Sequence, residues 1–247
     1  MQDVYVWAAL SWLLGGLFNG IAGFGAALVA MPLILHHIPA SVSVPACTMI
    51  VLALNIQVFL RYRHSTKSER VVPILLGGIP GAAVGIIALR GLSGHGLRLW
   101  LGALLIAYSF CGLFFARPRS NAVSQIWGMI AGFLSTLFGS AFGINGPPLV
   151  VYSSMSYWRK EEIKGVIGFF SVITCSIILG VQGLSGLQGI DSFILFLSSL
   201  PTVLIGGMIG SRISCIFSES TYRNILFLAV MLMGVTMIYN ILLINRQ

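Results

Sequence analysis

The chain has 247 residues, of which 57% are hydrophobic and only 8% are charged. A water-soluble domain carries about 25% charged residues, so this composition excludes a soluble fold. The net charge of +8 does not indicate a nucleic-acid partner, because the fourteen Lys and Arg residues stand in short connections between apolar stretches, as residues that set membrane orientation do. The bilayer is therefore the expected solvent, and helices are the expected elements.

Eight apolar stretches follow one another along the chain, at residues 4–38, 44–61, 71–89, 97–115, 124–152, 163–183, 193–213 and 222–244. The first stretch lacks the basic start of a cleavable signal peptide, so we expect it to belong to the mature protein. Stretches 4–38 and 124–152 would measure about 45 to 50 Å as straight helices, well beyond a hydrocarbon core of about 30 Å. Each has a glycine cluster at its middle, which predicts a break there.

The two long stretches are related by an internal repeat. An offset of 116 positions lays GLFNGIAGFGAALVAMPLI over GFLSTLFGSAFGINGPPLV. The third and seventh stretches match more weakly, with Gly81 and Gly85 over Gly206 and Gly210. This spacing of small residues lets helix backbones approach closely. The repeat predicts two halves, residues 1–118 and 119–247, which together form one transmembrane domain.

The basic residues favour one of two ways of threading these stretches through the membrane. If each stretch crosses once, the two faces hold seven basic residues each, and no orientation is predicted. If each long stretch enters, breaks and returns to the same face, one face holds eleven and the other three. The eleven are Arg61, Arg63, Lys67, Arg70, Arg117, Arg119, Arg159, Lys160, Lys164, Arg212 and Arg223; the three are Arg90, Arg98 and Arg246. The second threading is favoured: an all-α membrane protein with two inverted-topology repeats, each a broken hairpin followed by three crossings, and both termini outside the cytoplasm.

We expect the chemistry to lie at the two breaks, since non-helical backbone is tolerated at membrane depth only inside protein or beside a watery cavity. The second short helix of each hairpin would direct free N–H groups and its positive dipole end at the membrane middle, which suits an anion. The candidate substrate-binding residues are Asn19, Gly20, Gly23, Phe24, Gly25, Ser140, Gly143, Asn145 and Gly146 at the breaks, with Asn55 and Gln57 on stretch 44–61. The alternatives are glycines that only pack, and side chains that only cap helices. For Asn55, Gln57 and the counterparts Ser171, Thr174 and Ser176, the alternative is interhelical hydrogen bonding.

The sequence offers little for other chemistry. All six acidic residues fall in connections or at ends, so no mid-membrane carboxylate is expected to carry a coupling proton or bind Na⁺. The four cysteines are scattered one per apolar stretch, and we expect no metal, disulfide framework or cofactor. An enzyme would need a nucleophile, base or metal cluster in the core, so we expect none. Export of an anion needs no coupling ion, because the membrane potential supplies about 2.3 kcal/mol per charge per 100 mV.

The two glycine-rich segments resemble the duplicated signature of the sulfite exporter TauE/SafE permeases, a Gly-rich stretch followed by Pro and aliphatic residues. The resemblance covers nearly the whole chain, and its motif positions are Gly16, Gly23, Gly25, Pro32, Gly132, Gly139, Gly143, Gly146 and Pro148. The chain departs from the family pattern of consecutive glycines at positions 25–27 and 143–146, where added side chains narrow the tips.

The resemblance implies a multi-pass permease of the bacterial inner membrane that exports sulfite or an organosulfonate. An anion channel, or an uptake permease for another oxyanion such as thiosulfate, is the alternative. The expected partners are this small anion and the lipid bilayer. A homo-oligomer is left open.

Overall fold

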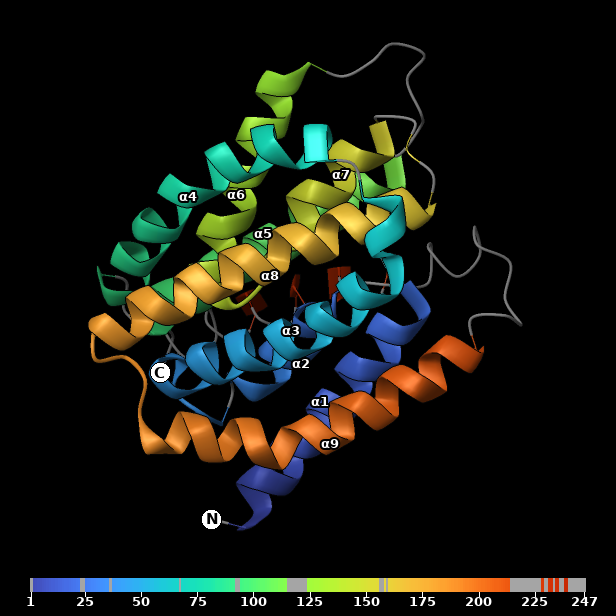
Figure 1. The fold of residues 1–247 in the computed structure, drawn as a ribbon. Coiled ribbons are helices and arrows are strands. Elements are labelled where there is room, and N and C mark those ends of the chain that lie inside the picture. Colours follow the sequence, from blue (N-terminus) through green and yellow to red (C-terminus); the bar gives the residue numbers. More distant parts are fainter. Residues whose placement is uncertain are drawn as a thin grey trace.

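The computed structural model describes residues 2–22, 25–35, 37–66, 68–91, 94–114, 124–155, 158 and 160–213, with isolated positions after residue 227. Within these residues the chain is all-helical (Figure 1): α1 (Gln2–Ala22), α2 (Ala26–Ile34), α3 (Ala40–Tyr62), the 3-10 turn η1 (Arg63–Ser65), α4 (Ser68–Gly91), α5 (Gly94–Phe114), α6 (Gln125–Phe142), α7 (Pro147–Met155), α8 (Lys160–Leu184) and α9 (Ile190–Ile213). Among them, α3, α4, α6, α8 and α9 are long and apolar enough to cross a membrane. The expected stretch 222–244 and the connection with Arg117 and Arg119 lie almost wholly outside the described residues.

Both long apolar stretches are interrupted where their glycines predict a break. The first divides into α1, which ends at Ala22, and α2, which begins at Ala26; the second divides into α6 and α7 at residues 143–146. Gly25 precedes α2 with a φ of 92°, and Gly143 ends α6 with a φ of 76°. This left-handed region costs a residue with a Cβ atom about 1–2 kcal/mol. Each break therefore contains one position where the backbone favours glycine.

The second helix of each interrupted pair runs back along the first. Trp7 Nε1 donates to the Leu33 carbonyl at 3.2 Å, and the Trp7 ring meets His37 edge-on, so the end of α2 lies beside the start of α1. In the other pair, a Cβ placed on Gly128 would lie 3.0 Å from the Tyr152 hydroxyl, so α7 returns toward the start of α6. Each pair is a helical hairpin whose tip is the glycine break.

Each hairpin packs its first helix along a long helix from the other half of the chain. α1 lies along α9, and α6 lies along α4, while α3 and α8 pack against each other near the middle (Figure 1). A Cβ at Gly16 would collide with the Val203 carbonyl, and one at Gly132 with the Ile74 carbonyl. The absence of side chains at these crossings lets the backbones come into contact.

The same contacts fix the register between the halves. The sequence comparison places Gly81 over Gly206. In the structure, a Cβ on Gly206 would meet the Leu13 carbonyl, and one on Gly77 would meet the Met129 carbonyl. Leu13 and Met129 are related by the offset of 116, so Gly77 is the structural counterpart of Gly206, one helical turn earlier than expected. Sequence alone did not resolve this, because glycines recur at every fourth position from 77 to 85.

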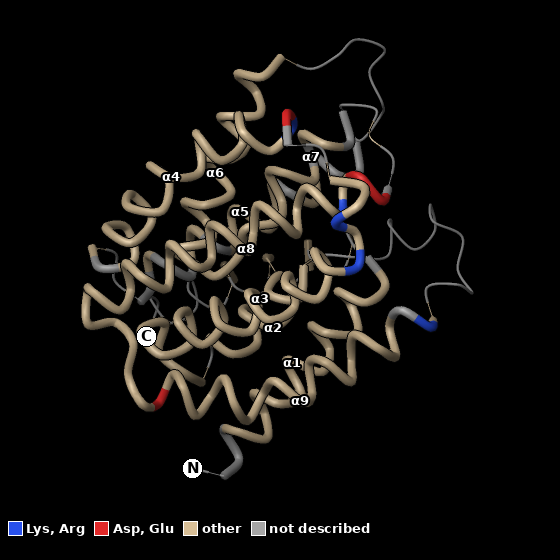
Figure 2. The backbone as a smooth tube through the Cα atoms, viewed as in Figure 1, with Lys and Arg blue, Asp and Glu red and all other residues tan. Residues whose placement is uncertain are grey.

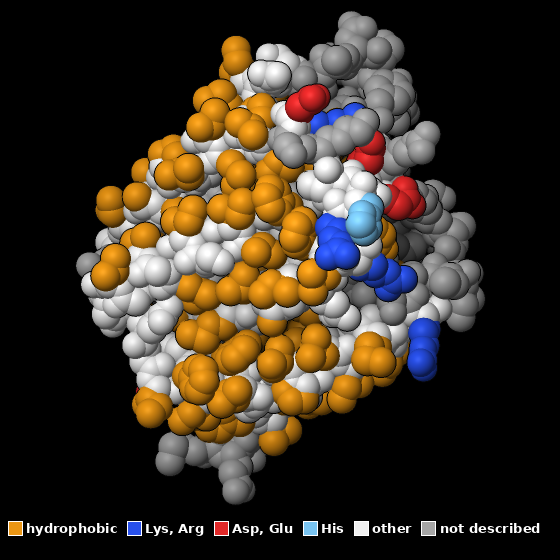
Figure 3. Space-filling view, in the orientation of Figure 1, with side chains coloured by type: hydrophobic (Ala, Val, Ile, Leu, Met, Phe, Trp, Pro, Cys, Tyr) orange, Lys and Arg blue, Asp and Glu red, His pale blue; other side chains and the backbone are white. Residues whose placement is uncertain are grey.

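The described charges gather mainly at one end of the molecule. Figure 2 shows Lys and Arg where α3 and α9 end and where α4 and α8 begin, and Figure 3 shows this end beside an apolar surface that covers most of the same face. Arg70 Nη1 donates to Glu162 Oε2 at 2.6 Å, and its guanidinium lies 5.0 Å from the ring centre of Trp158. The basic end thus ties α4 to α8 and to the chain that follows α7.

Candidate anion-binding site

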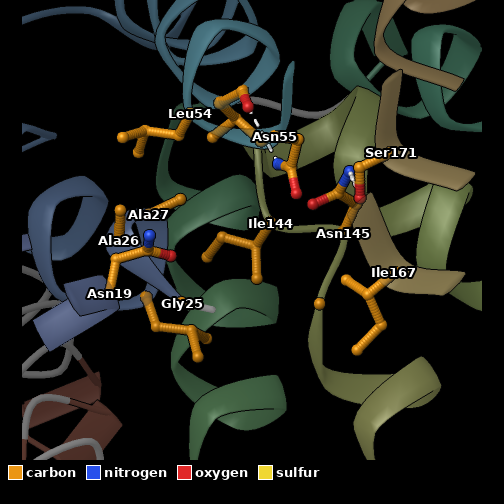
Figure 4. A pocket seen from close by; sticks show the side chains of 13 residues that line it. Asn19, Gly25, Ala26, Ala27, Leu54, Asn55, Ile144, Asn145, Ile167 and Ser171 are labelled. Carbon is orange, nitrogen blue, oxygen red and sulfur yellow. Dashed lines mark hydrogen bonds between the residues drawn. The ribbon is translucent and has the colours of Figure 1, made fainter. Parts of the chain in front are cut away.

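A cavity lies between the tips of the two hairpins (Figure 4). Its walls come from the last turn of α1, the start of α2, the middle of α3, the α6–α7 break and α8. The lining residues are Asn19, Gly25, Ala26, Ala27, Leu28, Val51, Leu54, Asn55, Ile144, Asn145, Gly146, Ile167 and Ser171. The cavity volume of about 30 Å³ has room for two or three water molecules, since one needs about 10 to 15 Å³. A guest of only a few heavy atoms fits this space.

The first hairpin contributes the N-terminus of α2. Gly25, Ala26 and Ala27 line the cavity, and the first N–H groups of a helix have no partner within it. The N–H of Leu28 is already bound to the Gly25 carbonyl at 2.9 Å. The N–H groups of Ala26 and Ala27, together with the positive end of the helix dipole, form a donor surface that suits an anion. Asn19 adds its amide from α1.

The second hairpin contributes mainly one polar side chain, and the N-terminus of its second helix offers few hydrogen-bond donors. Its short helix α7 begins with Pro147 and Pro148, which have no N–H group to donate. The expectation of two equivalent helix ends rich in free N–H groups therefore holds less well on this side. Asn145, only 7% exposed, lines the cavity instead. Its Nδ2 donates to Ser171 Oγ at 3.3 Å and to Cys175 Sγ at 3.4 Å, which holds the break against α8.

The remaining wall combines one polar side chain of α3 with apolar residues. Asn55 Nδ2 donates to the Val51 carbonyl, one turn earlier on α3, at 2.8 Å, and the amide reaches into the cavity (Figure 4). Leu54, Ile144 and Ile167 supply apolar surface. The described lining contains no Lys, Arg, His, Asp or Glu, so any charge on a guest must be met by dipoles alone.

The structure brings five of the eleven candidate residues together around the cavity, namely Asn19, Gly25, Asn55, Asn145 and Gly146. Four others lie outside its lining. Ser140 is buried and donates to the Thr136 carbonyl within α6, Gly143 is contacted by Cys47, Gly20 belongs to α1, and Gln57 is exposed on α3. Gly23 and Phe24 lie outside the described residues.

The sequence left Ser171 outside the candidate substrate-binding residues, with interhelical hydrogen bonding as its alternative role, and it missed the apolar wall. Ser171 faces the cavity from α8, where it accepts from Asn145. A signal for this position was present, since stretch 163–183 is the counterpart of stretch 44–61, which holds Asn55. Nothing in the sequence marked Ile144 and Ile167, because apolar residues that line a cavity in a membrane protein are of the same types as those that pack elsewhere.

Interrupted hairpins, several membrane-length helices and an uncharged cavity between the hairpin tips together define a polytopic membrane protein. The chain belongs to the sulfite exporter TauE/SafE family, whose profile matches residues 8–237. It is similar to a probable sulfite/organosulfonate exporter TauE of Cupriavidus necator, with 21% identity over 218 residues that cover 86% of this chain and 85% of the relative. No solved structure matches. The resemblance carried by the glycine motifs is confirmed, and the chain is a membrane transport protein.

Proposed function

We propose that this protein exports a small sulfur-containing anion, such as sulfite or an organosulfonate, across the bacterial inner membrane. The observation that carries the proposal is the cavity between the two hairpin tips, which combines a helix N-terminus with three asparagine amides and no ionised side chain in its described lining. The family and the name of the similar protein support the substrate class. An anion channel through the same cavity, or uptake of another oxyanion such as thiosulfate, is the competing function.

The proposed architecture is two inverted repeats, residues 1–118 and 119–247. The helix directions support it. α1 runs parallel to α9 toward the basic end, whereas α6 runs parallel to α4 away from it. The two hairpins therefore enter from opposite ends of the molecule and bring their tips together. Such an arrangement is common among secondary transporters, whose substrate sites lie near the bilayer midplane at the repeat interface.

The proposed orientation places the basic end in the cytoplasm. The described basic residues that support it stand at helix ends that Figure 2 shows near one another: Arg61 at the end of α3, Arg63 in η1, Arg70 in the first turn of α4, Lys164 near the start of α8 and Arg212 at the end of α9. The positive-inside rule requires such a distribution. The start of α1 lies at the other end, so the N-terminus is proposed to be periplasmic. The charge count of the sequence places the C-terminus there too, and cysteine labelling of tags at both termini in intact cells tests both placements.

Outward movement of an anion follows from the electrical potential. A bacterial interior is negative, and each elementary charge gains about 2.3 kcal/mol per 100 mV on leaving. A binding site made of dipoles releases its guest more easily than one built on a buried Lys or Arg. Because no described carboxylate lines the cavity, we propose that export proceeds without a protein-borne coupling ion.

The test is flux of radiolabelled sulfite from loaded proteoliposomes under an imposed potassium diffusion potential. We expect efflux that saturates with internal sulfite and accelerates when the interior is made negative. Efflux that ignores the voltage contradicts electrogenic export, and a flux that stays linear with concentration favours a channel. Asn145→Leu should abolish the saturable flux, while Gln57→Leu, an exposed position on α3, serves as the matched control.

A further inference from the structure

The cavity presents hydrogen-bond donors on one side and acceptors on the other. Ala26 and Ala27 of the first turn of α2 line the cavity beside Asn19. Their N–H groups have no acceptor within the helix, so they are the donors of this side. The Asn19 amide has no hydrogen bond among the described residues, so it can turn either its nitrogen or its oxygen toward a guest. This side therefore accepts negative charge.

The opposite side is made by the amide oxygens of two other asparagines. Asn55 Nδ2 donates to the Val51 carbonyl at 2.8 Å, and because a carbonyl only accepts, the orientation of this amide is fixed. Asn145 Nδ2 donates to Ser171 Oγ and Cys175 Sγ, which leaves Oδ1 for the cavity. Figure 4 shows the oxygens of Asn55 and Asn145 pointing into the space between α3 and the break. Both oxygens need a donor from any guest that displaces water.

An anion without a hydrogen atom satisfies only half of this cavity. Its oxygens would pair with the N–H groups of α2, but they would face the partial negative charge of the two amide oxygens. A dianion would be worse, because it buries a second charge and still leaves both acceptors unpaired, and each of these effects costs free energy.

We infer that the cavity takes a monoprotonated oxyanion such as hydrogensulfite. Its negative oxygens face Ala26 and Ala27, and its hydroxyl donates to Oδ1 of Asn55 or Asn145. The inference rests on the proposed function and narrows the substrate to one protonation state. The cavity volume of about 30 Å³ agrees with an ion of this size.

The guest then carries its own proton across the membrane. On the helices around the cavity, the described titratable side chains are Tyr5 of α1, Cys47, Arg61 and Tyr62 of α3, Glu69 and Arg70 of α4, Tyr152 of α7, Glu161, Glu162, Lys164 and Cys175 of α8, and Asp191 and Arg212 of α9. None of these side chains lines the cavity. Two of them contact the break, since Cys175 accepts from Asn145 and Cys47 donates to the Gly143 carbonyl at 3.5 Å. Each transported ion thus moves one proton together with one net negative charge.

The test compares sulfite with methanesulfonate, a monoanion with three oxygen atoms and one methyl group that has no hydrogen to donate in a hydrogen bond. Binding of each to the purified full-length protein is measured by isothermal titration at about pH 6 and about pH 8, on either side of the ionisation of hydrogensulfite to sulfite. We expect sulfite to bind about tenfold more tightly at the lower pH, because the fraction of hydrogensulfite rises about tenfold. Methanesulfonate does not titrate in this range, so it should bind more weakly than sulfite and with the same affinity at both pH values. A change in its affinity between the two pH values would report titration of the protein.

A pair of variants locates the acceptor. Asn55→Leu removes one amide oxygen and should weaken sulfite binding at about pH 6 by about fivefold, while methanesulfonate binding is unchanged. Gln57→Leu, on the same helix outside the cavity, should change neither. The comparison of the two anions on the unmodified protein stands even if a variant does not fold.

Two results would overturn the inference and leave the proposed function in place. One is sulfite that binds as tightly at about pH 8 as at about pH 6. The other is methanesulfonate that matches sulfite at the lower pH. If no sulfur oxyanion binds at any pH, the proposed function falls together with the inference.

Discussion

Gly139 provides a way to move Asn145 without touching its chemistry. It lies in the last turn of α6, where an added Cβ would stand 2.9 Å from the Cβ of Asn145 and 3.5 Å from Cδ1 of Ile178. Carbon atoms attract each other from about 3.5 Å outward, so Gly139→Ala must displace Asn145 by about 0.6 Å. The two hydrogen bonds of Asn145 Nδ2 are already 3.3 and 3.4 Å long. A further displacement of this size takes them beyond the range of effective bonds.

We therefore expect Gly139→Ala to weaken sulfite binding by about tenfold, which is about 1.4 kcal/mol. Overpacking of this kind costs about 1–3 kcal/mol in folded cores, so the thermal midpoint should also fall by a few degrees. Binding is measured by isothermal titration, and folding by thermal unfolding in the same detergent.

Gly180→Ala is the matched control for this experiment. Gly180 is exposed on α8, and an added Cβ there meets nothing within 4 Å. The control should keep the affinity of the unmodified protein. If Gly139→Ala binds sulfite within twofold of the control, Asn145 is not a ligand, and the cavity does not hold the anion in the way described.

The remaining predictions concern stability. Gly16→Ala places a Cβ against the Val203 carbonyl, which cannot rotate away, and should destabilise the protein by about 1–3 kcal/mol in thermal unfolding. A loss of stability no larger than in Gly180→Ala would show that α1 and α9 are not in contact. Arg70→Gln removes both the ion pair with Glu162 and the contact with Trp158, and it should lower the free energy of unfolding by about 1 kcal/mol, and by less at high salt. A loss of stability that does not depend on salt would contradict an electrostatic cause. Gln182→Met removes a buried Oε1 that has no partner among the described residues, together with the long 3.5 Å hydrogen bond from Nε2 to Thr48 Oγ1. It should raise stability by about 1 kcal/mol with transport unchanged, so a variant that loses transport would assign that oxygen a function.

The breaks could be predicted from the sequence because two physical limits meet there. A helix of about 30 residues is too long for the hydrocarbon core, and glycine clusters mark where it can be interrupted. The structure places Gly25 and Gly143 in the left-handed region, as such an interruption needs. The position of Asn145 at the cavity could be predicted for the same reason, because it stands within the second glycine cluster.

The difference between the two hairpin tips was present in the sequence but was overlooked. The duplication suggested two matching helix ends, but Pro147 and Pro148 remove the N–H groups on one side. The proposed role of Asn55 as a hydrogen-bond acceptor depends on its bond to the Val51 carbonyl, and the sequence does not reveal the orientation of a side-chain amide. Gln57, two residues away, has the same chemical groups and faces away from the cavity.

The crossing of α1 with α9 and of α6 with α4 has a mechanical consequence. The segments that grip one another most closely come from different halves of the chain, so the duplicated units of the sequence are not separate bodies in space. Neither half can move as a rigid body without breaking the close contacts between its glycines and the carbonyl groups of the other half. Under the proposed function, a rearrangement that exposes the bound ion first on one side and then on the other would move each hairpin together with the helix of the other half that it contacts. Each moving part would then contain helices from both halves of the chain.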